Sequence, residues 1–311
     1  MRKLILAPLL SSASLASAAV IGIEFNFTPF VGNPAKADHV QTVPGIATVF
    51  INNVPVASQD VGQQDVPVLF ENKEIGPAVW VPASSMGQSL RKGKNKIRIE
   101  FNPSNAKSSY DAQLRWAAVT DQETHTEKAG GASATNQSNE GADNRKAVVG
   151  KLVAEREFAA DFAADLPWHH FPAVTALADT DKQALTALVA QRADLFKPDF
   201  SSAYQFLKTA STPGMQLDVA GIKKAKILDK AYSAGLRMAA PAAGTLDFVL
   251  TGNPEVVVRS TTGNLFPLDP EALSKIKGDE LQLGLSMVLP ALFPPQVVAV
   301  RDASGKWSIV Y

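Results

Sequence analysis

Apolar residues occupy every second position in several short stretches of the first half of the chain. In residues 95–101, for example, Ile97, Ile99 and Phe101 alternate with charged side chains. Successive side chains of a β-strand point to opposite faces, so this alternation predicts half-buried strands. The pattern recurs in 21–27, 47–56, 95–101 and 111–119. The second stretch contains Asn52-Asn53, which predicts a hairpin because asparagine tolerates the positive φ of a tight turn.

Short strands separated by turn residues, without a helical period, are typical of an antiparallel β-sandwich. We therefore expect an all-β domain at residues 19–119. The pattern changes after it, because 120–148 carries almost no apolar residues and includes Gly130-Gly131 and Asn136-Gln137-Ser138-Asn139. Such a stretch buries too little apolar surface to offset its ordering entropy, which predicts a disordered linker.

The second half, 149–311, is predicted to be an α+β domain in which helices precede a mostly antiparallel sheet. Helical spacing of apolar residues predicts helices at 149–166, 180–197, 200–207, 222–236 and 269–278. Alternation predicts strands at 246–250, 255–260, 281–289, 296–301 and 306–311. Thr180 and Gln183 form a predicted capping box, and Asp269-Pro270 predicts another helix start.

The beginning of the chain predicts an export signal at residues 1–18. Met1-Arg2-Lys3 is positively charged, an apolar run follows, and Ala16-Ser17-Ala18 has the small side chains that a signal peptidase accepts. We expect cleavage after Ala18 and a periplasmic or secreted mature protein. A membrane anchor is the alternative, but the apolar run is far shorter than the roughly 20 residues of a spanning helix. No later stretch is apolar enough to predict an integral membrane segment.

Composition narrows the classes of function. The chain has no cysteine, which excludes disulfides, thiolate catalysis, iron–sulfur clusters and zinc–thiolate sites. Its 30 basic residues balance 30 acidic ones, and removing Arg2 and Lys3 with the signal leaves 28 basic residues against the same acidic total. The sequence therefore predicts no general attraction to nucleic acid or anionic lipid.

The N-terminal half resembles one known family. Val81-Pro82-Ala83, followed by Leu90-Arg91-Lys92-Gly93-Lys94-Asn95 and an alternating strand, resembles a phrase of galactose-binding-like jelly-roll domains. The stretch from Phe50 to Val56 looks like the strand-turn-strand that precedes this phrase. The resemblance implies a jelly-roll sandwich, and such domains either bind sugars or brace a neighbouring domain. No sugar-stacking aromatic residue carries over to this sequence.

The C-terminal half resembles a second family. Gly305-Lys306-Trp307-Ser308-Ile309-Val310 is similar to the last hairpin of nuclear-transport-factor-like cone folds. The resemblance implies helices that precede a curved antiparallel sheet. In that family the cone is either a ligand pocket or an inert core, so the resemblance bears on fold more than on function.

One cluster of residues has the chemistry of metal ligands. Asp161, Asp165 and His169 are spaced by four residues, which would place them on one face of a helix, and His170 follows. Pro167 argues against a continuous helix, because proline disrupts a helix interior. We therefore predict that the two histidines are structural, at the polar end of a helix, and that no metal is bound.

Basic residues cluster in two places. Arg91, Lys92, Lys94, Lys96 and Arg98 lie in one loop and strand, and Lys223, Lys226, Lys230 and Arg237 follow helical spacing. Charge runs of this kind are usually solvated faces. The alternative is contact with lipopolysaccharide, anionic lipid or an acidic protein.

The remaining motifs assign no catalytic, cofactor-binding or metal-binding residue. Thr251-Gly252-Asn253 and Thr262-Gly263-Asn264 lack the lysine and the following helix of a phosphate loop, so they predict hairpin turns. We infer an exported envelope protein that acts by binding, with an envelope protein or a polysaccharide as the partner and the β-sandwich as a carbohydrate-binding candidate. Two alternatives stay open: an inhibitor or immunity-type protein that blocks a toxic enzyme, and a hydrolase of envelope polymers.

Overall fold

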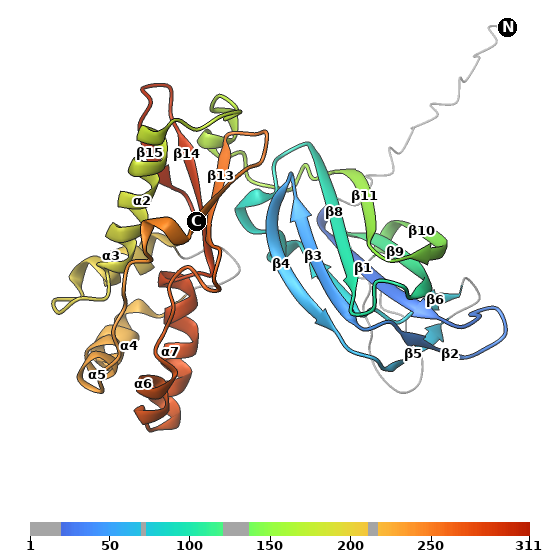
Figure 1. Ribbon diagram of the computed structural model, residues 1–311, viewed down its shortest axis with the longest axis horizontal. Coiled ribbons are helices and arrows are strands. Elements are labelled where there is room, and N and C mark those ends of the chain that lie inside the picture. Colours follow the sequence, from blue (N-terminus) through green and yellow to red (C-terminus); the bar gives the residue numbers. More distant parts are fainter. Residues whose placement is uncertain (1–19, 70–72, 121–136, 211–216) are drawn as a thin grey trace, which may run out of the picture. The chain divides into compact units, whose positions relative to one another are not determined.

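The computed structural model describes residues 20–69, 73–120, 137–210 and 217–311, and Figure 1 shows its helices and strands. The predicted signal at 1–18 lies outside these residues. Contacts divide the chain into two compact units that do not follow the order of the sequence. The first unit comprises the described parts of Met1–Val43, Gly62–Ala83 and Ser109–Val148, and the second comprises those of Pro44–Val61, Ser84–Ser108 and Val149–Tyr311.

The first unit is built on one antiparallel sheet, in the order β10-β9-β1-β2-β5-β6, with β7 also paired to β1. Its central strand is β1 (Val20–Val31), in which Phe25 and Phe27 are fully buried between less buried neighbours, as the alternation predicts. The other strands are β2 (His39–Thr42), β5 (Asp65–Leu69), β6 (Glu74–Ile75), β7 (Val79–Pro82), β9 (Ser109–Thr120) and β10 (Gln137–Val149).

The prediction of a disordered linker over 120–148 is wrong for its last part, which forms strand β10 beside β9. Residues 121–136 lie outside the described part of the chain. Strand β10 stands at the edge of the sheet, and most of its described side chains are exposed. Gly141 lies where any Cβ would overlap the ring of Trp116. An edge strand needs a backbone ladder on one side only, so a polar sequence can form it without apolar residues.

The second unit begins with a four-stranded antiparallel sheet, in the order β11-β8-β3-β4. Its strands are β3 (Gly45–Ile51), β4 (Val54–Val61), β8 (Lys94–Pro103) and β11 (Leu152–Ala159). Ile97, Ile99 and Phe101 are fully buried, which confirms the predicted strand. The predicted hairpin is also present, and its turn residues Asn52 and Asn53 have φ of 50° and 68°.

Residues 149–166 were expected to be helical, and this prediction is wrong. Residues 152–159 form β11, which pairs with β8 along its whole length. Leu152 and Ala154 are buried while Val153 and Glu155 are exposed, so the stretch also carries a two-residue period. Some apolar residues of the stretch are also spaced as in a helix. The strand forms because pairing with β8 supplies backbone hydrogen bonds along the whole of β11.

The rest of the second unit combines helices with a second four-stranded antiparallel sheet, in the order β12-β13-β14-β15 (Figure 1). Its strands are β12 (Leu246–Leu250), β13 (Glu255–Ser260), β14 (Gln296–Arg301) and β15 (Trp307–Ile309). Its helices are α2 (Asp179–Ala193), α3 (Ser201–Ala210), α4 (Val219–Lys224), α5 (Ile227–Ser233), α6 (Pro270–Lys275) and α7 (Asp279–Leu292). Short helices α1 (Ala83–Met86), η1 (Gly87–Ser89), η2 (Pro167–His170) and η3 (Ala243–Thr245) lie in connections.

Both faces of this second sheet are covered within the unit. Val256 and Val258 of β13 join the core formed by the helices. Val257, between them, packs with Val298 of β14 and with Val54 at the start of β4. The alternation along β13 therefore sends successive side chains into two different apolar clusters. The β-hairpin and the helical core are thus joined through one sheet.

The strand predicted at 281–289 is wrong, because this stretch belongs to helix α7. Leu285, Val288, Leu289 and Leu292 are buried in the helical core, with the spacing of one helix face, whereas Leu283 is 65% exposed. Val288 breaks the alternation, and Leu281, Leu285, Val288 and Leu292 follow one another at spacings of four, three and four residues, which also fits one face of a helix. The 14-residue length of α7 and its packing on α3 and α5 favour the helix.

The single helix predicted over 222–236 is divided into α4 and α5. Lys226 stands between them with φ of 55°, in the left-handed region. A lysine in this conformation ends the first helix and begins the second at a new angle. The predicted helix at 180–197 is confirmed as α2, which ends at Ala193. The predicted capping box of Thr180 and Gln183 is wrong, because the helix begins at Asp179 and the capping carboxylate is that of Asp181, which accepts a hydrogen bond from the Ala178 N–H at 3.0 Å.

Candidate functional site

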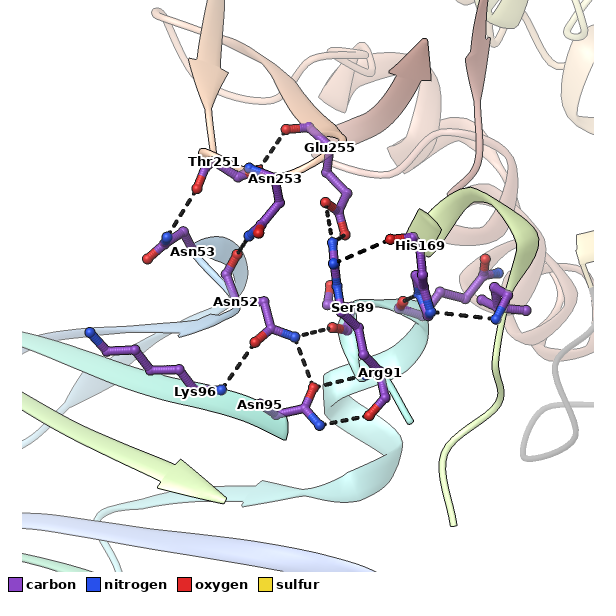
Figure 2. A network of polar contacts seen from close by, with 12 residues as sticks. Asn52, Asn53, Ser89, Arg91, Asn95, Lys96, His169, Thr251, Asn253 and Glu255 are labelled. Carbon is purple, nitrogen blue, oxygen red and sulfur yellow. Dashed lines mark hydrogen bonds and ion pairs between the residues drawn. The ribbon is translucent and has the colours of Figure 1, made fainter. Parts of the chain in front are cut away.

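The asparagine turn between β3 and β4 anchors a network of polar contacts (Figure 2). Asn53 Nδ2 donates to the Thr251 carbonyl at 2.9 Å, and Asn253 Nδ2 donates to the Asn52 carbonyl at 2.8 Å. These two bonds join residues about 200 positions apart in the sequence. The Asn52 amide also binds Asn95 Oδ1 at 2.8 Å. The two-residue turn therefore connects the first sheet of the second unit to its second sheet.

The loop before β8 is closed by Asn95. Its Oδ1 accepts from the Arg91 N–H at 2.8 Å, and its Nδ2 donates to the carbonyls of Arg91 at 2.6 Å and Gly93 at 2.9 Å. Asn95 is buried in phase with Ile97, so its amide takes a position that an apolar side chain would otherwise fill. This arrangement fixes the direction in which the Arg91 side chain leaves the loop.

Arg91 reaches a carboxylate that has no solvent exposure. Its Nη2 lies 2.5 Å and 2.6 Å from the two oxygens of Glu255, and the side-chain exposures are 20% and 0%. Arg91 Nη1 also donates to the His169 carbonyl at 3.5 Å, while Arg91 Nε is buried without a partner. A buried carboxylate needs such a partner, because its desolvation costs several kcal/mol.

His169 is held by hydrogen bonds on both ring nitrogens. Nδ1 accepts from the Leu166 N–H at 3.4 Å, and Nε2 lies 3.0 Å from the Gln88 carbonyl, so the neutral ring carries its proton on Nε2. Burial lowers the pKa of His169, and this effect exceeds the opposing one of the bond to Gln88. The Trp168 ring meets the imidazole edge-on at 4.1 Å.

A cavity of about 920 Å³ lies next to this network in the second unit. Ser89, Trp168 and Tyr311 belong to both, since Ser89 Oγ lies 2.5 Å from the Tyr311 hydroxyl and Trp168 lies 5.9 Å from the Tyr311 ring. Burial raises the pKa of Tyr311. The other lining residues include Thr48, Pro55, Val56, Ala57, Ser58, Ser85, Gln88, Arg192, Phe206, Leu217, Arg259, Pro290, Pro294, Pro295, Gln296 and Ile309.

The lining is mostly apolar and contains two arginines but, among the described residues, no Asp or Glu side chain. Arg259 is paired with Asp247 at 2.9 Å. Arg192, which is 7% exposed, donates instead to the carbonyls of Leu292 at 2.5 Å and Ala291 at 3.1 Å. Burial lowers the pKa of Arg192 to about 10, so the guanidinium is still protonated at neutral pH. The cavity therefore carries positive charge at an apolar surface.

Asp161, Asp165, His169 and His170, which have the chemistry of metal ligands, do not form one cluster. His169 and His170 lie in the short helix η2, so the helical face that would join them to Asp161 and Asp165 does not exist. His170 Nε2 contacts Asp165 Oδ1 at 2.7 Å in an exposed pair, whereas His169 turns to the buried network. Among the described residues, no three His, Asp or Glu side chains lie close enough together to hold a metal ion.

The first basic cluster is not a free positive face. Arg91 is bound to Glu255, Lys96 contacts Glu155 at 2.6 Å, and Arg98 lies 3.7 Å above the Phe50 ring while pairing with Glu100. Lys92 and Lys94 are exposed. Only part of the predicted cluster thus remains as a solvated surface.

The second basic cluster is split by the break at Lys226, so Lys223 and Lys230 lie on different helices. Arg237 donates to the carbonyls of Tyr232 and Leu236, at 2.6 Å and 2.7 Å. It therefore caps a helix end. The four residues do not form the single stripe that the spacing predicts.

Four important residues were not identified as site candidates from the sequence. Thr251-Gly252-Asn253 is a turn, as predicted, but its Thr251 and Asn253 also bind the asparagine hairpin. Glu255 and Arg192 were not singled out. Each interrupts an apolar pattern, since Glu255 precedes three valines and Arg192 lies three residues after Val189 on the buried face of α2. A charged residue at an apolar position is the signal that identifies them.

Comparison with known proteins gives no match to any family model, curated protein or solved structure. Within the described residues, no helix has the length and apolar character needed to cross a membrane.

Proposed function

We propose that this protein acts by binding, as an accessory factor of the cell envelope, and that the cavity of the second unit is its binding site. The observation that carries the proposal is the lining: a largely apolar cavity of about 920 Å³ with two guanidinium groups and, among the described residues, no Asp or Glu side chain. Ligand sites in proteins have volumes of roughly 300–1,000 Å³ and combine apolar walls with a few polar groups.

The same lining favours binding over catalysis. Its ionisable groups are Arg192, Arg259 and Tyr311. The raised pKa of Tyr311 keeps its hydroxyl protonated, and that hydroxyl is engaged with Ser89. A general base works best with a pKa near the operating pH, and neither Arg192 nor Tyr311 meets that condition. His169 has a lowered pKa, but both of its ring nitrogens are occupied by backbone groups.

The envelope location rests on the predicted signal at 1–18. We expect the protein recovered from the envelope fraction to lack these residues and to begin at Ala19. Intact-mass measurement tests this, and a full-length chain retained in the membrane would contradict it. The carbohydrate-binding role and the jelly-roll sandwich suggested by the resemblance at 81–99 remain predictions for the N-terminal part of the chain.

The cavity is tested with the dye 1-anilinonaphthalene-8-sulfonate, which combines apolar rings with one negative charge. We expect saturable binding to the mature protein, with enhanced dye fluorescence. Ser58→Trp places a large side chain at the cavity lining and should abolish this binding. Asp60→Trp is the matched control, because Asp60 is also exposed on β4 but does not line the cavity. Equal dye binding by both variants would refute the assignment of the site.

A further inference from the structure

We infer that the ligand of this cavity is an anionic amphiphile whose acidic headgroup binds Arg192 and whose hydrocarbon chain lies against the proline-rich wall. The inference rests on the proposed binding function and specifies its ligand. Every ligand of this class has one negatively charged headgroup on an apolar chain. A carboxylate head and a phosphate head are both compatible with it.

Arg192 is a buried cation without a counter-ion among the described residues. It is 7% exposed, and its hydrogen bonds to the described residues go to backbone carbonyls and not to an Asp or Glu side chain. It contacts the two carbonyls at the end of α7 and the face of the Phe206 ring, whose centroid lies 3.6 Å from the guanidinium carbon. Carbonyls at a helix C-terminus carry only partial negative charge, and a ring face carries less. The full charge of Arg192 is therefore only partly compensated by the protein.

The guanidinium also retains donor capacity. Nε and Nη2 donate to Leu292 and Ala291, whereas Nη1 makes no hydrogen bond to the described residues. Phe206 and Ala291, which contact Arg192, line the cavity together with it. A guanidinium that is oriented on two sides and open on the third is suited to bind an anionic oxygen.

The wall around this charge is poor in hydrogen-bond donors. Pro55, Pro290, Pro294 and Pro295 line the cavity, and proline has no backbone N–H. Leu217 and Ile309 add aliphatic side chains. Such a surface favours a hydrocarbon chain, which gains about 0.8 kcal/mol for each CH₂ removed from water.

The edge strand β4 argues against an extended peptide as the occupant. A peptide that adds to a sheet edge needs free N–H and C=O groups along that edge. Pro55 has no N–H, and its carbonyl already accepts from Gln296 Nε2 at 2.5 Å. The segment of β4 around Pro55, which lines the cavity, therefore cannot form a continuous ladder of backbone hydrogen bonds with an incoming strand.

The test compares ligands with the same twelve-carbon chain and different heads. Dodecanoate and dodecyl phosphate are measured against the neutral dodecan-1-ol by displacement of the anilinonaphthalene dye from the mature protein. We expect at least one anionic ligand to bind about tenfold or more tightly than the alcohol, as charge-assisted hydrogen bonds predict. The tighter of the two anions identifies the headgroup. Equal binding of all three would overturn this inference but leave the cavity intact, whereas no displacement by any of them would refute the proposed function as well.

Arg192→Met removes the charge and retains an unbranched side chain over Phe206. We expect it to reduce binding of the preferred anion about tenfold or more and to change binding of the alcohol less than threefold. Arg259→Gln is the matched control, because Arg259 lines the cavity but is paired with Asp247, and it should have little effect. An unchanged anion affinity in Arg192→Met would overturn the assignment of the anchor.

A measurement on the unaltered protein covers the case in which Arg192→Met does not fold. The carboxyl carbon of [1-¹³C]dodecanoate reports its own protonation by NMR when the acid is bound. We expect the pKa of the bound acid to be lower than that of the free acid, because a nearby cation favours the carboxylate. A raised pKa would show that burial alone acts on the headgroup, and it would overturn the inference.

Discussion

Arg91 and Glu255 are separated by 164 positions in the sequence, yet Arg91 Nη2 lies within 2.6 Å of both carboxylate oxygens of Glu255. The carboxylate has no solvent exposure. The pair connects the loop before β8 to the start of β13, in the same region where Asn53 binds Thr251 and Asn253 binds Asn52. It thereby holds together the two sheets of the second unit, both of which contribute residues to the cavity lining.

The first prediction concerns this ion pair. Arg91→Leu leaves the Glu255 carboxylate buried without its cation, and we expect a loss of about 3–5 kcal/mol in the free energy of unfolding. Urea denaturation at neutral pH measures it. Lys92→Ala, which changes an exposed lysine in the same loop, should cost less than about 0.5 kcal/mol. The double variant Arg91→Leu/Glu255→Leu should recover much of the loss, and a double variant as unstable as the sum of the singles would contradict the pairing.

The second prediction concerns pH and His169. Burial lowers the pKa of this imidazole in the folded protein, so the unfolded chain takes up a proton at a higher pH than the folded chain does. The free energy of unfolding contributed by His169 therefore falls as pH decreases below the unfolded value of about 6.5, and it stops falling below the folded pKa. His169→Gln keeps a donor for the Gln88 carbonyl but does not titrate, so we expect a shallower loss of stability between pH 7 and 5.

Trp168→Phe is the control for that experiment. It removes an indole that packs on His169 at 4.1 Å but removes no titrating group. It should lower the free energy of unfolding by a similar amount at both pH values. If His169→Gln shows the same pH dependence as the wild type, His169 is not the group responsible.

The third prediction concerns the start of α2. Asp181 accepts hydrogen bonds from the Trp307 indole at 2.9 Å and the Ala178 N–H, and it contacts Arg301 at 3.2 Å. The Trp307 bond is the main cause that lowers the pKa of Asp181. The stabilisation is therefore present at neutral pH and is lost as pH falls through the lowered pKa. Asp181→Asn should lower the free energy of unfolding by about 1–3 kcal/mol at pH 7 and by much less near pH 3. Denaturation at both pH values measures this difference. An equal loss at both would contradict the electrostatic account.

The strands of the first half could be predicted because strict alternation of apolar and polar residues fits a β-strand and not a helix. Residues 95–101 have buried and charged side chains in strict turn, and their two-residue period is incompatible with a helix. Residues 281–289 lacked this property, since Val288 interrupts their alternation and Leu281, Leu285 and Val288 also fit one helix face. The packing of α7 on α3 and α5 selects the helix. Strand β10 was missed for a different reason: its stability comes from a neighbouring strand and not from its own apolar residues.

The site was less accessible to sequence reasoning than the fold. Asn95 is in phase with Ile97 and Ile99, so a polar residue at a core position could be recognised. Its partners are less predictable, because Arg91 lies in its own loop but Asn52 lies 43 residues away. Arg192 likewise occupies an apolar helix face, but the absence of a nearby carboxylate in the described residues depends on how distant segments meet. Such convergence follows from tertiary packing, which no local pattern encodes.

The last prediction concerns Lys226, whose left-handed conformation separates α4 from α5. Its φ is 55°, and its side chain caps no backbone group. A non-glycine residue loses roughly 1–2 kcal/mol in this conformation, whereas glycine adopts it freely at a cost of about 0.4–1 kcal/mol in unfolded-state entropy. Lys226→Gly should therefore leave the free energy of unfolding unchanged or raise it by up to about 1 kcal/mol.

Lys230→Gly is the matched control, because Lys230 is also an exposed lysine but lies inside α5. It should lower the free energy of unfolding by about 1 kcal/mol, the usual cost of glycine in a helix. Thermal or urea denaturation of the two variants compares them directly. Equal destabilisation by both would show that residues 222–236 form one continuous helix after all.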